Sequence, residues 1–340
     1  MGERGGWRRR GSKSRGFRYY DARGREITDP AKLERIDELK VPPAWRDVRI
    51  SPTPRAKLQA VGYDKAGRKQ YLYSAEFRAK QEEAKFQKLV RFGEKLPEIR
   101  AAMSDDMDRD QLDLGRVCAI ALRLIDLGWF RPGSERSAKE SRTYGITSLR
   151  KGHVRVRGSK IALDFPGKHK VRVRTALVDD ELAVAIEELL ELKGGRRLFR
   201  FRNGDEALVS LSERHLNAYV QEHMGDEFTV KDFRTWGGTL LAAIALAERG
   251  PVEAEPQARK AVTAVCRSVA DRLGNTPAVC RASYISPPVI EQYMDGRTIE
   301  DFRPRHLRVV SARNSTLDPE ELALLSLLRS WRIRQARAAA

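Results

Sequence analysis

The sequence predicts an α+β protein that has a small β-rich N-terminal domain and a larger, mainly α-helical catalytic domain with a small three-stranded antiparallel sheet. Three observations support this division. Short β-like runs separated by turns occupy about residues 18–74, a strongly apolar helical pattern covers 109–129, and the chain after Asp179 has helical spacing. A chain of 340 residues, of which 41% are hydrophobic, is long enough to bury two cores.

We divide the chain at two positions. Residues 1–16 combine glycine and serine with six basic residues, and this composition predicts a flexible basic tail that could add nonspecific affinity for DNA or RNA. Residues 17–95 are predicted to form the β-rich domain. Residues 96–340 are predicted to form the helical domain.

The elements follow from periodicity and from turn residues. In the N-terminal domain, β-like runs are expected at 47–50, 57–60 and 70–73, followed by a charged helix over 75–100 and the apolar helix over 109–129. Further β-like runs lie at 146–149, 153–157, 161–165 and 171–177, where turns at Gly158-Ser159 and Gly167 indicate a three-stranded meander. The remaining helices are expected at 180–193, 211–224, 235–249, 257–273 and 277–284, with a last one opening at Asp318.

The charge balance indicates a polyanionic partner. The formal net charge is +18 and the isoelectric point is near 10.0, which favours nucleic acid. The longest apolar runs, 117–122 and 240–246, are far shorter than the roughly 20 residues that a membrane-spanning helix needs. The arginine-rich start lacks the apolar stretch of a signal peptide, so we expect no membrane association.

The cysteines and histidines indicate neither a metal site nor a disulfide framework. Cys118, Cys266 and Cys280 are widely spaced, and the five histidines have no metal-ligand spacing. The chain also lacks a Walker-type phosphate-binding motif. We therefore expect no metal, cofactor or nucleotide, and a reducing compartment, namely the cytoplasm, in association with DNA.

Tyr284 is the strongest candidate for a nucleophile. Gly274 is typical of a helix end, while Thr276 and Pro277 are typical of the N-cap and first position of the next helix, so Asn275 lies in the turn between them. Tyr284 comes at the end of that short helix, just before Ser286-Pro287-Pro288. The ordinary alternative is a half-buried helix tyrosine.

Three basic residues could contact the phosphate that Tyr284 would attack. Arg131 follows the apolar helix, Lys168 lies on the hairpin after 161–165, and Arg234 lies at the head of another apolar helix. Each also has an ordinary explanation: a charge interacting with a helix C-terminus, a solvated turn lysine, and an ion pair with Asp232. It is the combination of Arg131, Lys168, Arg234, Asn275 and Tyr284 that suggests phosphoryl transfer from DNA to tyrosine.

Six motifs carry a resemblance to the type IB DNA topoisomerases of the poxvirus-like and bacterial branch, over about residues 40–300. They are Phe130-Arg131-x-Gly133, Gly167-Lys168-x-Lys170, Lys231-Asp232-x-Arg234-Thr235, Leu273-Gly274-Asn275-Thr276-Pro277, Val41-Pro42-Pro43-Ala44-Trp45, and Gly67-Arg68-Lys69-Gln70-Tyr71-x-Tyr73. The chain departs from the poxviral relatives at Asn275, where they carry histidine. An amide can still donate a hydrogen bond to a phosphate oxygen, so we expect the reaction to be retained and only its rate to differ.

The resemblance implies the fold shared with tyrosine recombinases and a monomer that closes around double-stranded DNA as a clamp. It implies that Tyr284 forms a 3′-phosphotyrosyl bond, that Arg131, Arg234 and Asn275 stabilise the transition state, and that Lys168 is the general acid. No metal or ATP is then needed, and both signs of supercoil are relaxed by strand rotation and religation. In the N-terminal domain, the residues expected to face DNA are Arg68, Lys69, Gln70, Tyr71 and Tyr73.

Two alternatives remain open from the residues themselves. A tyrosine recombinase uses a similar set, but usually has His-x-x-Arg where this chain has Lys231-x-x-Arg234, and its N-terminal domain is helical. A nonenzymatic nucleic-acid-binding protein would carry the same residues as part of a basic surface. Tyr293, further along the chain, is interpreted as ordinary packing.

Overall fold

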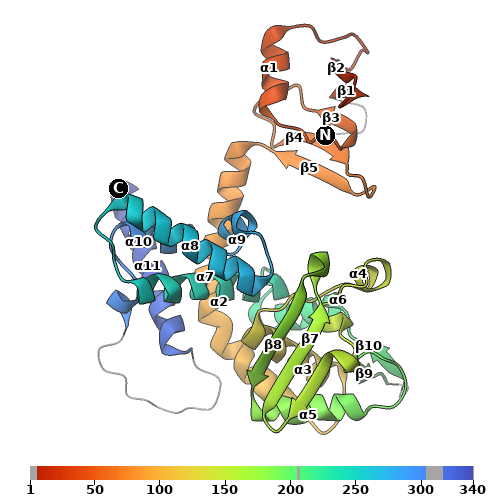
Figure 1. Ribbon diagram of the computed structural model, residues 1–340, viewed down its shortest axis with the longest axis vertical. Coiled ribbons are helices and arrows are strands. Elements are labelled where there is room, and N and C mark those ends of the chain that lie inside the picture. The colour runs from red at the N-terminus through yellow and green to blue at the C-terminus, as the bar shows by residue number, and fades with distance from the viewer. Residues whose placement is uncertain (1–5, 205–206, 304–316, 340) are drawn as a thin grey trace. The chain divides into compact units, whose positions relative to one another are not determined.

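The computed structural model describes residues 6–204, 207–303 and 317–339, and the chain forms two compact units (Figure 1). The first unit ends at Lys85 and the second begins at Phe86, within the long helix α2 (Ala75–Met107). The border differs from the predicted one after residue 95, because helical periodicity continues through that position and offers no break.

The N-terminal unit is a five-stranded antiparallel sheet with one short helix, α1 (Pro30–Glu38). Its strands are β1 (Trp7–Ser12), β2 (Gly16–Tyr20), β3 (Arg46–Ile50), β4 (Leu58–Tyr63) and β5 (Lys69–Tyr73), in the spatial order β2-β1-β3-β4-β5. One face of the sheet forms a small core, in which Trp7, Ile50 and Ala60 are buried together with Ile36 from α1.

The prediction of a flexible tail over residues 1–16 is wrong for the part that the structure describes. Trp7–Ser12 is a strand between β2 and β3, with Trp7 in the core. The Arg9 side chain donates hydrogen bonds to the carbonyls of Val41, Pro42 and Trp45. Composition alone suggested disorder because it does not register that alternate residues of a strand face opposite sides. Residues 1–5 of the predicted tail lie outside the described residues.

The second unit is built around α3 (Leu114–Gly128), most of whose residues are buried. Asp113 caps its start, accepting a hydrogen bond from the Arg116 N–H. Helices α5 (Asp180–Glu191), α6 (Glu213–Met224) and α7 (Val230–Arg249) pack against α3. The other helices are α4 (Glu135–Glu140), α8 (Glu255–Leu273), α9 (Pro277–Ser283), α10 (Pro287–Met294) and α11 (Pro319–Ala339).

A three-stranded antiparallel meander lies beside these helices, in the order β6 (Val154–Arg157), β7 (Lys160–Pro166) and β8 (Arg172–Val178), with α5 packed against it (Figure 1). The predicted α+β class is thus confirmed. Two local expectations were wrong: Ile146–Ser148 forms a 3₁₀ turn instead of extended chain, and a short hairpin, β9 (Arg200–Arg202) with β10 (Leu208–Ser210), interrupts the region expected to be helical. Segments this short give periodicity too few residues to distinguish the two states.

Across the described ranges, no helix is both long enough and apolar enough to cross a membrane.

Candidate active site

Two helix ends meet where the predicted cations gather. Helix α3 is capped at its C-terminal end by Trp129, which adopts a left-handed conformation with φ of 51°; its carbonyl oxygen accepts a hydrogen bond from α7. Helix α8 is capped by Gly274, which is also left-handed with φ of 60°, and this leaves the Leu273 carbonyl without a helical partner. These carbonyls accept hydrogen bonds from arginine side chains.

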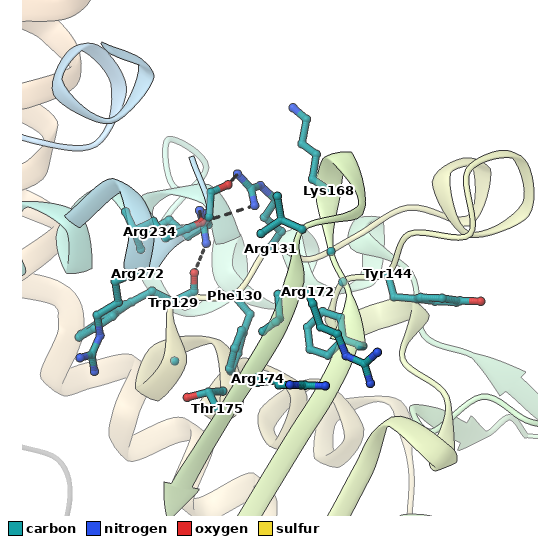
Figure 2. Close-up of a pocket in the computed structure, with 18 of the residues that line it drawn as sticks. Trp129, Phe130, Arg131, Tyr144, Lys168, Arg172, Arg174, Thr175, Arg234 and Arg272 are labelled. Atoms are coloured by element: carbon teal, nitrogen blue, oxygen red, sulfur yellow. Dashed lines mark hydrogen bonds between the residues drawn. The ribbon is translucent and has the colours of Figure 1, made fainter. Parts of the chain in front are cut away.

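Arg131 and Arg234 converge on the end of α8. Arg131 Nη2 donates to the Gly274 carbonyl at 3.0 Å and to Asn275 Oδ1 at 2.5 Å. Arg234 Nη2 donates to the Leu273 carbonyl at 2.9 Å, and its Nη1 donates to the Trp129 carbonyl. The two guanidinium groups therefore hold the backbone at the end of α8, and Figure 2 shows Arg131 and Arg234 beside each other there.

Arg234 is buried, with 3% of its surface exposed, and in the described part of the chain no carboxylate pairs with it. Its Nε is buried and has no hydrogen-bond partner there. Burial, with a further contribution from the charge of Arg131, lowers the pKa of Arg234 to about 10. The ion pair with Asp232 considered from the sequence does not form, because Asp232 binds Lys88 at 2.7 Å and caps α7 through the Thr229 N–H.

Tyr284 lies beside Arg234 at the end of α9. The guanidinium carbon of Arg234 is 5.2 Å from the centre of the half-buried phenol ring. The Tyr284 carbonyl accepts a hydrogen bond from Thr239 Oγ1 at 3.1 Å, and a Cβ atom added to Gly238 would come within 2.9 Å of Tyr284 Cβ. The close approach permitted by Gly238 thus fixes the tyrosine backbone on α7, the helix that carries Arg234.

Lys168 lies on the connection between β7 and β8 and is exposed. The next two residues, His169 and Lys170, have positive φ values of 59° and 61°, so the hairpin turns sharply at this point. Figure 2 shows the Lys168 side chain extended outward from the hairpin, away from the paired arginines. The structure therefore brings together Arg131, Arg234, Asn275 and Tyr284, and leaves the Lys168 amine outside this group.

A pocket of about 390 Å³ lies between the hairpin and the helix ends (Figure 2). Its lining includes Arg131, Lys168 and Arg234, together with residues that the sequence analysis missed: Arg172, Arg174 and Arg272. The alternating arginines of β8 were a usable signal, since alternate residues of a strand share a face. In the described part of the chain, no cluster of three or more His, Cys, Asp or Glu side chains could hold a metal ion.

Comparison with known proteins decides the family. A family model of the catalytic core of eukaryotic DNA topoisomerase I matches residues 74–303, and a model of the N-terminal domain of bacterial DNA topoisomerase IB matches residues 16–64. The chain belongs to the type IB DNA topoisomerases. The resemblance identified from the six motifs is confirmed.

Viral and animal relatives agree with this assignment. The chain is 33% identical over 286 residues to the DNA topoisomerase 1B of Acanthamoeba polyphaga mimivirus, covering 82% of this chain and 85% of the relative. It is 23% identical over 275 residues to the vaccinia virus (strain Copenhagen) DNA topoisomerase 1B, covering 78% and 83%. Similarity to DNA topoisomerase 1 of Drosophila melanogaster is 26% over 173 residues, covering 49% of this chain and 17% of the relative.

The N-terminal unit of this topoisomerase separates the five residues expected to face DNA into two groups. Lys69, Tyr71 and Tyr73 alternate along β5, and the two tyrosines are 48% and 36% exposed. Arg68 Nε and Gln70 Nε2 instead donate to Asp64 Oδ2, at 2.8 Å and 3.0 Å. Arg68 and Gln70 therefore bind their own turn, while Lys69, Tyr71 and Tyr73 present an exposed basic and aromatic edge.

The buried tyrosine of α10 behaves as expected from the sequence. Tyr293 is 1% exposed, and its hydroxyl donates to the Gly250 carbonyl at 3.0 Å. It is a packing residue.

Proposed function

We propose that this topoisomerase relaxes positive and negative supercoils in double-stranded DNA by transient cleavage of one strand, with Tyr284 as nucleophile. The observation that carries the proposal is the pair of guanidinium groups beside Tyr284, which are held by carbonyls and lack a carboxylate partner in the described part of the chain. Two such cations are the complement of a phosphodiester.

In the first step, the Tyr284 oxygen attacks the phosphorus, and its proton is lost to water. The bond between phosphorus and the 5′-oxygen breaks, which leaves a 3′-phosphotyrosyl link and a free 5′-hydroxyl. Negative charge builds up on the nonbridging oxygens, where Arg131 and Arg234 donate hydrogen bonds. Rotation of the free strand and reversal of the same step restore the duplex without ATP or metal, because the covalent bond conserves the energy.

Asn275 supplies a neutral donor. Its Oδ1 accepts from Arg131 Nη2, which leaves Nδ2 with a long 3.5 Å contact to the Leu273 carbonyl and with donor capacity for a phosphate oxygen. Since an amide does not titrate, we expect this contribution to be independent of pH.

Lys168 is the proposed general acid for the departing 5′-oxygen. Its outward position requires the flexible side chain to swing into the pocket when DNA is bound. Lys168→Ala should slow cleavage by about 100-fold to 10,000-fold, the usual range for loss of a general acid. A 5′-bridging phosphorothiolate, which leaves without protonation, should restore the rate. A defect of equal size on the sulfur substrate would remove Lys168 from this role.

Relaxation of positively and negatively supercoiled plasmid in EDTA without ATP tests the proposal, with Tyr284→Phe as the inactive variant. The matched control is Tyr293→Phe, which also removes one phenol hydroxyl but only from packing. Relaxation of both plasmids by the parent and the control, but not by Tyr284→Phe, is the expected result. A covalent adduct that instead yields exchange between two duplexes would favour a recombinase, and binding without an adduct would favour a nonenzymatic protein.

We further propose that a single chain in the cytoplasm performs the reaction, with the N-terminal unit contacting the duplex through Lys69, Tyr71 and Tyr73. Sedimentation of the complex on a short duplex tests the stoichiometry. One chain for each cleaved duplex is expected.

A further inference from the structure

The outer face of the N-terminal sheet carries one continuous row of residues across all five strands. The strand register pairs Tyr20 with Arg8, Arg8 with Arg49, Arg49 with Val61, and Val61 with Tyr71. Directly opposed residues of antiparallel strands share a face, so these five side chains lie on one side of the sheet. A second pair on this face, Arg10 opposite Arg18, extends it along the β1–β2 hairpin.

The other face of the same sheet packs against the N-terminal core. Trp7, Ile50, Ala60 and Leu72 form the corresponding row there and belong to the N-terminal core. Arg9, between the two outward arginines, also points to this side and donates to main-chain carbonyls. The outer face therefore lies opposite the core of the unit, and it carries aromatic rings and several arginines.

The arginines of the outer face oppose one another without neutralisation. Arg8 lies directly opposite Arg49, and Arg10 directly opposite Arg18. Within the described residues, Arg8, Arg10 and Arg49 form no ion pair, and Arg18 has only a distant one with Glu26 at 3.9 Å. Like charges placed directly opposite each other destabilise a sheet. A bound polyanion would convert each repulsive pair into two favourable contacts.

We propose that the β1–β2 hairpin is part of the DNA-binding surface, with Arg8, Arg10 and Arg18 contacting phosphates of the duplex that Lys69, Tyr71 and Tyr73 contact at the other edge. Five strands about 4.8 Å apart span roughly 19 Å, enough to lie along several phosphates of one duplex. This inference rests on the proposed function. Arg8 and Arg10 lie outside residues 16–64, the part matched by the model of the N-terminal domain.

The test measures how binding to a short duplex depends on salt, in full-length protein that carries Tyr284→Phe so that cleavage cannot interfere. Each phosphate contact contributes about 0.9 to the slope of log K against log salt concentration. The double variant Arg8→Gln/Arg10→Gln should lower that slope by about 1.8, and Arg18→Gln alone by about 0.9.

The matched control is Lys32→Gln/Lys40→Gln, which removes the same charge from exposed lysines at α1 that already pair with Asp29 and Asp37. We expect its slope to equal that of the parent. Equal slopes for the hairpin variants and the parent, or an equal change in the hairpin and control variants, would overturn the inference. If the hairpin variants bind polyglutamate more weakly than the parent does but bind DNA equally well, the inference is also overturned. The outer face would then be assigned to an acidic protein.

The two proposals fail in distinguishable ways. Plasmid relaxation by the parent, compared with Tyr284→Phe, tests the proposed function alone. The salt slope is measured in a chain that cannot cleave, so it reports on the hairpin whether or not relaxation occurs.

Discussion

Arg100 and Arg234 are both largely shielded from solvent in the second unit, and their surroundings are opposite. Arg100 pairs with Asp126 at 2.8 Å and with Glu321 at 2.6 Å. Burial lowers its pKa, but the charges and hydrogen bonds of the two carboxylates outweigh burial, so its pKa is raised overall. Arg234 donates to two carbonyls, lies over the Tyr284 ring and pairs with no carboxylate in the described chain, and its pKa is lowered to about 10. One cation is neutralised by the protein, and the other is kept available for an anion.

The neutralised arginine supports the helix that carries the other one. Glu321, from α11, accepts from Arg100 and also from Trp236 Nε1 at 2.9 Å. Trp236 lies on α7, two residues after Arg234, and is 2% exposed. Helix α11 lies beyond residues 74–303, the part matched by the catalytic-core model. A segment outside the matched core thus completes the ion cluster that anchors α7.

The same substitution at both arginines should have opposite effects. Arg234→Met should lower the single-turnover rate of covalent adduct formation by about 1,000-fold, because the transition-state donor that we propose is lost. Its folding stability should stay near that of the parent, since a buried charge without a counterion is replaced by an apolar chain of similar volume. Urea denaturation alongside the cleavage assay measures both quantities. A variant that is strongly destabilised would show that Arg234 is also structural.

Arg100→Met should instead reduce the free energy of unfolding by about 3–5 kcal/mol, because it leaves Asp126 and Glu321 buried without their partner. Urea denaturation is the measurement. The folded fraction should still form the covalent adduct, as Arg100 does not touch the site. Unchanged stability would mean that water reaches the two carboxylates, so that they do not depend on Arg100 for stability.

A glycine links the position of Arg234 to that of Trp129. A Cβ atom on Gly237 would lie 2.2 Å from Trp129 Cδ1, so Gly237→Ala must displace Trp129, whose carbonyl holds Arg234. We expect roughly a tenfold slower cleavage and a loss of about 1–3 kcal/mol of stability, as for other overpacked sites. Gly152→Ala is the control, since a Cβ atom there meets nothing within 4 Å. Equal cleavage rates and stabilities of the two variants would show that Trp129 does not position Arg234.

The sequence predicted which residues gather at the candidate site better than it predicted their arrangement there. Residue type and order were enough to select Arg131, Arg234, Asn275 and Tyr284, since phosphoryl transfer demands those groups. That Arg234 is free of Asp232 depends on the capping geometry at the start of α7, which no local pattern displays. The outward direction of the Lys168 side chain likewise appears only in the folded hairpin, where the next two residues have positive φ values.

The N-terminal strand was missed for a related reason. Arg8, Arg9 and Arg10 read as a charge run, yet Arg9 faces the core while its neighbours face outward. Pairing with β3, some forty residues later in the chain, decides this alternation, and composition carries no information about a distant partner.

The smallest expected effects are changes with pH, one at the Arg100 cluster and one at Arg234. Burial raises the pKa of Glu321, but its hydrogen bond and charge interaction with Arg100 prevail, so its pKa lies below the ordinary value of 4.5. Its contribution to stability is therefore complete above pH 4.5 and is lost as the pH falls through the lowered pKa. Glu321→Gln should lack this part of the acid dependence in urea denaturation. A variant that retains it would assign the acid sensitivity to another carboxylate.

Folding favours the charged form of Glu321, whereas it disfavours the charged form of Arg234. Its folded pKa of about 10 lies below the ordinary 12.5, so between these values the unfolded chain binds more protons and the contribution of this group to stability rises with pH. Binding of a phosphate favours the charged form, so duplex affinity should fall as the pH rises through about 10. The measurement is the affinity for a short duplex as a function of pH, in Tyr284→Phe and in the double variant Tyr284→Phe/Arg234→Met. The fall in affinity should be smaller in the double variant. Equal falls would mean that another cation titrates in this range.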